Sequence, residues 1–159
     1  EGGGSTPGGE EKPGEGNTVV MSDAYSSCTE GSVEAGTITF GDATITFEKN
    51  DGNNAPMYYW NKTEAFRSVR MYAKNSMEMT ATKNIAKVVI NCAAPYSGTN
   101  YNGNDQMTTT AGTISKSADK LSVTIDGINS KSFTLANEYT ATTKGTQLRI
   151  VSMTITYAE

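Results

Sequence analysis

The chain has 159 residues, with 13 basic and 17 acidic side chains and a net charge of −4. This length suits one domain that buries a real core without metals or many disulfides. The mildly acidic charge and the scattered lysines and arginines argue against a nucleic-acid-binding protein, because a phosphate backbone demands clustered cations. Histidine is absent, which excludes Ser-His-Asp and Cys-His nucleophilic sites and most zinc sites.

The first 17 residues, EGGGSTPGGEEKPGEGN, contain seven glycines, two prolines and four glutamates. Such a composition buries too little apolar surface to offset the entropy of ordering. We therefore expect a flexible tether over 1–17 and a folded domain over 18–159. A tether of this kind is typical of a secreted or outer-membrane surface protein, anchored through a lipidated cysteine upstream of Glu1. No hydrophobic run reaches the length of a membrane span.

Apolar and small polar residues alternate with a period of two along much of the remaining chain, first at 36–40 and 43–47. This period is that of a β-strand with one buried face, and the 23 threonines suit pleated, half-exposed strands. Gly41-Asp42 and Lys74-Asn75 each predict a tight turn. Strands are expected at roughly 18–22, 36–40, 43–48, 57–60, 66–73, 76–81, 85–92, 106–110, 120–125, 131–136 and 146–157.

The last predicted strand, 146–157, changes phase along its length. Leu148 and Ile150 fall on one face, whereas Val151 and Met153 continue the apolar series on the other parity. A β-bulge near Ile150-Val151 would reconcile the two runs. Without a bulge, both faces of this strand would have to be buried.

Helical signal is confined to 61–66, where Asn61 or Thr63 can cap a single turn. Cys28 and Cys92 leave two alternatives: two free thiols, or one disulfide that closes a loop of about 64 residues and adds about 4 kcal/mol. The whole pattern predicts an all-β fold, a single and mostly antiparallel β-sandwich.

The stretch 45–92 contains ITFEKNDGNNAPMYYW, VRMYAKNSMEMTA and IAKVVINC, and the chain closes on LRIVSMTITY before its last two residues. These motifs resemble a module common in surface lipoproteins of Bacteroides-type gut bacteria. The resemblance covers about the last 115 residues and implies a jelly-roll-like β-sandwich. Several such modules accompany glycan-processing proteins, so the resemblance also implies carbohydrate binding. It carries over no functional residue.

Aromatic residues supply the strongest functional signal. The segment 57–60, MYYW, holds the only tryptophan, and Tyr96 and Tyr101 lie in the glycine- and asparagine-rich segment 95–105. Aromatic faces stack on the C–H faces of sugar rings, while Asn, Asp and Arg hydrogen-bond the hydroxyls. The expected ligand-binding residues are Trp60, Arg70, Tyr96, Asn100, Tyr101, Asn102 and Asp105. Two of them have plain alternatives, since Trp60 also suits the core and Arg70 also suits an outward-facing strand position.

Other chemistries have weaker support. A pair of carboxylates can hydrolyse glycosides, but most acids here fall at turns or on exposed faces, so no catalytic residue is assigned. Two oxygen-rich loops, 48–54 and 100–105, leave a structural calcium ion open, although neither matches the EF-hand spacing. No other metal and no cofactor is expected.

The sequence therefore predicts a non-catalytic module, on the cell surface or secreted, that binds a polysaccharide or oligosaccharide or supports a glycan-handling assembly. Two alternatives stay open. One is a structural or adhesion subunit, fimbrial-like, whose partner is another protein that pairs with a sheet edge. The other is a glycoside hydrolase with two facing carboxylates about 5–9 Å apart.

Overall fold

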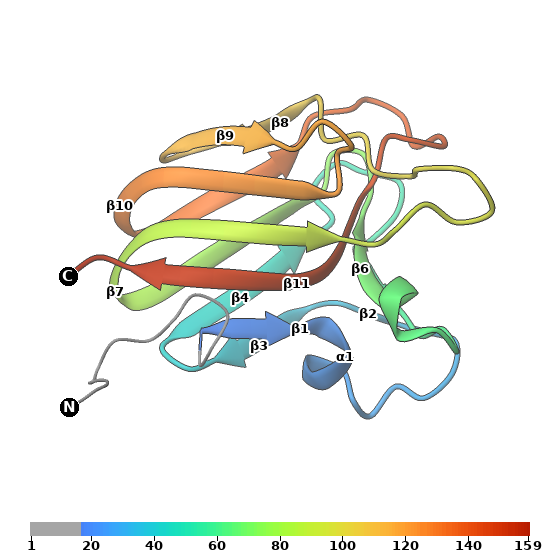
Figure 1. Cartoon of the computed structure of the whole chain (residues 1–159), viewed down its shortest axis with the longest axis horizontal. Coiled ribbons are helices and arrows are strands. Elements are labelled where there is room, and N and C mark those ends of the chain that lie inside the picture. Colours follow the sequence, from blue (N-terminus) through green and yellow to red (C-terminus); the bar gives the residue numbers. More distant parts are fainter. Residues whose placement is uncertain (1–16) are drawn as a thin grey trace.

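A computed structural model describes residues 17–159, so the expected tether lies outside the described residues except for Asn17. Eleven strands of the described part form one antiparallel sheet, which confirms the all-β, sandwich-like prediction (Figure 1). The elements are β1 (Thr18–Val20), α1 (Met21–Ala24), β2 (Ser32–Glu34), β3 (Thr37–Phe40), β4 (Ala43–Glu48), β5 (Met57–Tyr59), η2 (Glu64–Phe66), β6 (Ser68–Met71), β7 (Ser76–Cys92), β8 (Met107–Thr109), β9 (Thr113–Lys116), β10 (Ser122–Asn137) and β11 (Leu148–Tyr157). No helix within 17–159 has the length and apolar character needed to cross a membrane.

Two long strands, β7 and β10, belong to both halves of the sheet. Near the start of β7, Met79 pairs with Ile45 of β4 on one side and Phe133 of β10 on the other. Near its end, β7 pairs instead with β11 and with the first part of β10. The register between β7 and β10 shifts between Asp126 and Ser132. Both strands bend at the same end of the molecule, so the sheet folds back over itself (Figure 1).

The folded sheet buries one hydrophobic core. Alternate residues of the paired strands point inward, as the period of two predicts. The largest fully buried side chains are Tyr58, Phe133, Met21, Ile45, Met71, Met77, Met79, Ile85, Ile90, Ile125, Leu135 and Leu148. Full burial of a side chain of this size contributes roughly 1.5–3 kcal/mol. The outward-facing residues between them are the ones available for a ligand.

The phase change in the last strand is a β-bulge at Val151. Ile150 pairs with Cys92 and Ser152 pairs with the adjacent Asn91, which leaves Val151 as the extra residue on β11. The buried side chains accordingly change parity along the strand. The bulge predicted near Ile150-Val151 is therefore confirmed.

Both predicted turns are present. Gly41, with a φ of 58°, lies in the two-residue link between Phe40 and Ala43, which pair as the last residue of β3 and the first residue of β4. At the second turn Lys74 has a φ of 71° and the Asn75 N–H donates to the Tyr72 carbonyl. This second turn joins β6 to β7, which are separated in the sheet by β11.

Some boundaries differ from the sequence prediction. The strands expected at 76–81 and 85–92 are one strand, β7, because the exposed polar residues 82–84 interrupt the apolar pattern and not the backbone pairing. The short strands β2 and β9 were not predicted, since all three residues of β2 and most of β9 are exposed. The single turn expected in 61–66 is present as η2. Cys28 and Cys92 are free thiols.

Candidate functional site: an arginine and aromatic cleft

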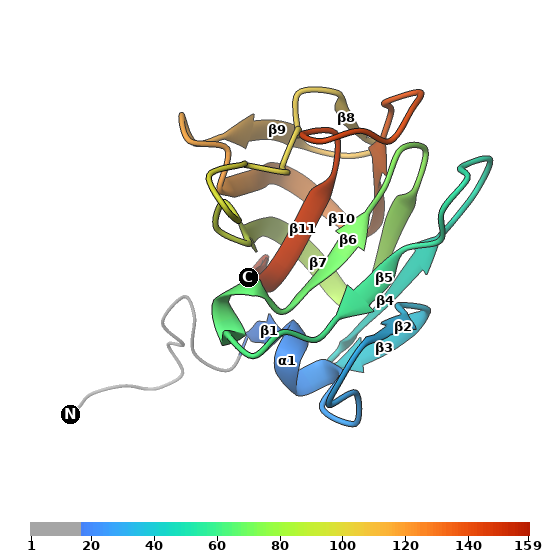
Figure 2. The same cartoon turned by 90° about the vertical axis from the view of Figure 1, so that its right-hand side faces the viewer.

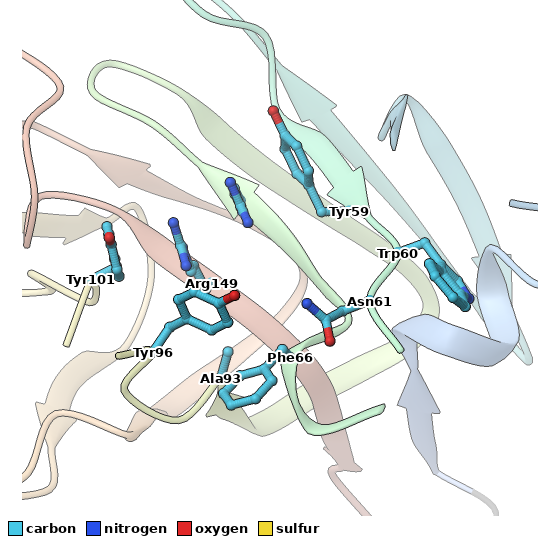
Figure 3. A pocket seen from close by; sticks show the side chains of 9 residues that line it. Tyr59, Trp60, Asn61, Phe66, Ala93, Tyr96, Tyr101 and Arg149 are labelled. Atoms are coloured by element: carbon cyan, nitrogen blue, oxygen red, sulfur yellow. The ribbon is translucent and has the colours of Figure 1, made fainter. Parts of the chain in front are cut away.

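Strands β5, β6 and β11 lie side by side (Figure 2). A cleft of about 280 Å³ opens over them. The residues that line it are Tyr59, Trp60, Asn61, Phe66, Arg70, Ala93, Tyr96, Tyr101 and Arg149. Five of these nine are aromatic, two are arginines and none is an acid. They come from three distant segments of the chain, which the sheet and the loop after β7 bring together (Figure 3). We call this site the arginine cleft.

Strand register places two arginines opposite each other. Arg70 of β6 pairs directly with Arg149 of β11. The neighbours of Arg70, Val69 and Met71, are buried in the core, so strand alternation directs Arg70 to the outer face. Leu148 and Ile150, the neighbours of Arg149, are buried as well, so Arg149 also points to the outer face. Directly opposed like charges destabilise a sheet, so this pair has a local energetic cost.

Each guanidinium lies on an aromatic ring. The pairs are Arg70 with Tyr59 at 3.7 Å, Arg149 with Tyr101 at 3.8 Å and Arg67 with Trp60 at 5.3 Å, from guanidinium carbon to ring centroid. These three are all the arginines of the chain. Stacking stabilises a guanidinium by cation–π attraction and fixes the plane of its N–H donors.

The two opposed arginines differ in their hydrogen bonds. The Nε of Arg149 donates to Oε1 of Gln147 at 2.9 Å. The Nε of Arg70 is buried and has no hydrogen-bond partner among the described residues. Burial, and next the charge of Arg70, lower the pKa of Arg149 to about 10. Arg149 is therefore still a cation at neutral pH.

The remaining aromatic platform is Tyr96 with Phe66. Their rings meet edge to face at 5.3 Å and 86°. Tyr96 closes a tight turn with Thr99 through backbone hydrogen bonds in both directions, and Gly98 inside the turn has a φ of 80°. The turn presents Tyr96 at the rim, where 47% of the residue is exposed. The Asn61 side chain accepts the N–H of Thr63, the residue that precedes η2, and η2 carries Phe66.

The Asn102 side chain connects the loop after β7 to β11 by hydrogen bonds, beneath the arginine cleft. Its side chain donates to the Ala93 carbonyl at 3.0 Å and to Oδ1 of Asn100 at 2.9 Å, and it accepts the N–H of Arg149 at 2.8 Å. The residue is only 2% exposed. Asn102 is therefore a positioning residue, which holds the backbone of Arg149 and the loop that carries Tyr101.

The structure brings four of the seven expected ligand-binding residues into the arginine cleft: Trp60, Arg70, Tyr96 and Tyr101. Trp60 also packs against the core, so its two interpretations coexist. In Figure 3 the Trp60 and Tyr101 side chains lie at opposite ends of the labelled group.

The other three lie outside the lining and contact the protein itself. Asn100 donates to the carbonyl of Asp119, and Asn102 has the positioning role described above. Asp105 forms ion pairs with Lys116 at 2.7 Å and with Lys120. These two lysines lower the pKa of the Asp105 carboxyl. Within 17–159 no three residues of the types His, Cys, Asp or Glu gather as a metal site.

Sequence reasoning missed Tyr59, Phe66 and Arg149 as site residues. For Arg149 a signal existed, since VRM and LRI each place an arginine between two apolar residues of a strand. Pairing of those two strands brings the arginines together. The register of that pairing depends on the whole fold, and neither motif alone predicts it.

Gly103 occupies a position with no room for a side chain. A Cβ there would lie 2.3 Å from the Gly145 carbonyl oxygen and 2.8 Å from Cε2 of Tyr139. Gly103→Ala should therefore force this loop away from Gly145 and Tyr139 and lower the free energy of unfolding by about 1–3 kcal/mol. Urea unfolding measures this loss, with the exposed Ala94→Ser as a control. Wild-type stability for Gly103→Ala would contradict the packing described.

No protein-family model matches the chain, and no curated protein matches it in sequence. The resemblance to surface-lipoprotein modules therefore stays a prediction, and the arginine cleft has to be interpreted from its own geometry.

Proposed function

We propose that the protein is a non-catalytic module that binds a glycan in the arginine cleft. The observation that carries the proposal is that five aromatic side chains and two arginines line one open cleft, with Tyr96, Tyr101 and Arg149 near one another in Figure 3. Aromatic faces suit the apolar C–H surfaces of sugar rings, and guanidinium and amide groups suit their hydroxyls.

The aromatic residues of the cleft differ in how much of each ring is free to contact a ligand. One face of Tyr59 and one face of Tyr101 are already covered by arginines. Tyr96 is the most exposed aromatic residue of the lining and is held from the side by Phe66. Tyr96 therefore offers the free face on which a sugar ring stacks, while Arg70, Arg149 and Asn61 offer donors around it.

The dimensions of the cleft favour a short ligand. Its volume of about 280 Å³ is near the lower limit of small-molecule sites, roughly 300–1,000 Å³. We propose that it accepts the end of a chain or a short oligosaccharide. The described residues that line the cleft include no Asp or Glu and so no carboxylate pair for glycoside hydrolysis, and the proposal is limited to binding.

The alternative of a protein partner that adds a strand has less support. The strands with a single neighbour in the sheet are β1, β2, β3, β8 and β9, and each has only three or four residues. Such short edges offer little backbone for strand addition. The proposed module acts on a cell surface or in secreted form, an assignment that rests on the N-terminal composition and on the sequence resemblance.

Glycan screening of the full chain tests the proposal. The wild-type protein should bind at least one glycan, and Tyr96→Ala should weaken that binding about tenfold or more, the cost of losing one stacking contact. Tyr96→Phe, which keeps the ring, should retain most of the affinity. Binding that is indifferent to Tyr96→Ala, or no binding to any glycan, would contradict the proposal.

A further inference from the structure

We propose that the glycan is acidic: it carries an oxyanion, a carboxylate or a sulfate, that binds between Arg70 and Arg149. This inference rests on the proposed function and names the class of sugar that the arginine cleft selects. Four observations support it, from charge balance, residue type, unsatisfied donors and the position of the sugar platform.

The first observation concerns charge balance. The chain as a whole has a net charge of −4, yet among the residues that the structure describes the cleft is lined by two arginines and no acid. The three ion pairs of the described part all use lysines: Lys83–Asp42, Lys116–Asp105 and Lys120–Asp105. Within 17–159 neither Arg70 nor Arg149 has a carboxylate partner, so an anion supplied by a ligand would balance them.

The second observation concerns residue type. All three arginines of the chain lie in or beside the cleft, and no lysine of the described part, 17–159, lines it. A lysine supplies the same charge, but only the planar guanidinium both stacks on a ring and binds two oxygens side by side. Tyr59 and Tyr101 cover one face of Arg70 and Arg149. This arrangement suits bidentate hydrogen bonds to a carboxylate or sulfate.

The third observation concerns unsatisfied donors. The buried Nε of Arg70 lacks a partner among the described residues, and the two guanidiniums repel each other across the strand pair. Unpaired buried donors and opposed like charges destabilise a fold, and such features are concentrated at sites that bind a ligand. An anion between the arginines would relieve the repulsion, because it attracts both.

The fourth observation is the position of the sugar platform. Tyr96 and Arg149 point into the same space (Figure 3), and both line the cleft. A pyranose ring stacked on Tyr96 can thus direct a charged substituent toward the arginine pair. The selected ligand is an acidic sugar because the stacking face and the cations belong to one cleft.

Matched ligands test the inference with the full chain by isothermal titration calorimetry. One pair is trigalacturonate and its methyl ester, and the other is a sulfated galactan tetrasaccharide and its desulfated form. We expect the charged member of at least one pair to bind about tenfold or more tightly than its neutral partner at low salt. That preference should shrink as salt is added. The pair that shows it identifies the oxyanion as carboxylate or sulfate.

Variants separate the arginine pair from general charge. Arg70→Gln and Arg149→Gln should weaken binding of the charged form more than binding of the neutral form, and so reduce the preference to about threefold or less. Lys131→Gln removes the same charge at an exposed position of β10 and should keep the preference. Arg149→Lys keeps the charge but loses the paired N–H donors of the planar guanidinium. It should give a preference for the charged ligand between those of the wild type and Arg149→Gln. Circular dichroism checks that each variant is folded.

The possible failures are distinguishable. Equal binding of charged and neutral forms would overturn the acidic-glycan inference and leave the proposed function intact. A charge preference that survives both arginine substitutions would overturn it as well. If none of the four oligosaccharides binds while the glycan screen yields a neutral ligand, the inference is overturned and the proposed function stands. Absence of binding both to these four and to every glycan of the screen would contradict the two together.

Discussion

Asn102→Ala is expected to lower the free energy of unfolding by about 2–4 kcal/mol and to abolish binding in the arginine cleft. The substitution removes the acceptor of the Arg149 N–H and the donor to the Ala93 carbonyl. Each buried polar group left without a partner costs about 1–3 kcal/mol. Arg149 and the Tyr101 loop then lose their common support.

Urea unfolding and ligand titration measure the two effects of Asn102→Ala. Asn91→Ala is the matched control, because Asn91 is exposed on β7 and bonds only the Ser152 hydroxyl through its side chain; its cost should stay below about 0.5 kcal/mol. Asn102→Asp should be as harmful as Asn102→Ala, since it loses the donor and buries a charge. Wild-type stability in either Asn102 variant would show that the positioning role is wrong.

Alkaline pH should destabilise the protein steeply between about pH 9 and pH 12. Burial raises the pKa of the Cys92 thiol from 9.0 to about 12, and the charge of Asp119 adds to the effect. Burial also raises the pKa of Tyr72 to about 12 and raises that of Tyr25. In this range the native state keeps protons that the unfolded chain releases, so the free energy of unfolding falls as pH rises.

Cys92 makes a contribution to this pH dependence that can be removed by mutation. The shift of its pKa corresponds to about 2–4 kcal/mol once its remaining solvent contact is considered. That stability is fully present below pH 9 and lost as pH approaches 12. Arg149 acts in the opposite direction, because its native pKa of about 10 lies below the ordinary 12.5, and the native state releases that proton first.

Denaturant unfolding from pH 7 to pH 11, with a reductant present, measures this dependence. Cys92→Ala should flatten the alkaline loss, whereas Cys28→Ala, which removes the other thiol, should leave the slope unchanged. An alkaline slope in Cys92→Ala as steep as in the wild type would contradict the burial assigned to this thiol.

The strands were predictable because their signal is local. Alternation along a strand is visible in the letters themselves, and even the bulge at Val151 was predicted from the change of parity around it. The continuity of β7 was not predictable in the same way. Its exposed residues 82–84 resemble a turn, and only the pairing with neighbouring strands shows that the backbone continues.

The site was predictable in part, for a physical reason. Tyr96 stands out because loop-forming residues surround it, so its exposure could be expected. Arg149 and Tyr59 join the site through strand register across β5, β6 and β11, which no local pattern specifies. Asn102 and Asp105 were expected to contact a ligand. A loop sequence rich in polar residues does not distinguish those that bind the protein's own backbone or lysines from those left free.

The place of binding is tested most directly by an NMR titration with the oligosaccharide that binds most tightly. We predict that the indole N–H signal of Trp60 and the Nε–H signals of Arg70 and Arg149 shift on addition of ligand, while backbone signals of β9 stay in place. Shifts confined to β9 or to the loop 48–54, with the arginine signals unmoved, would contradict a binding site in the arginine cleft.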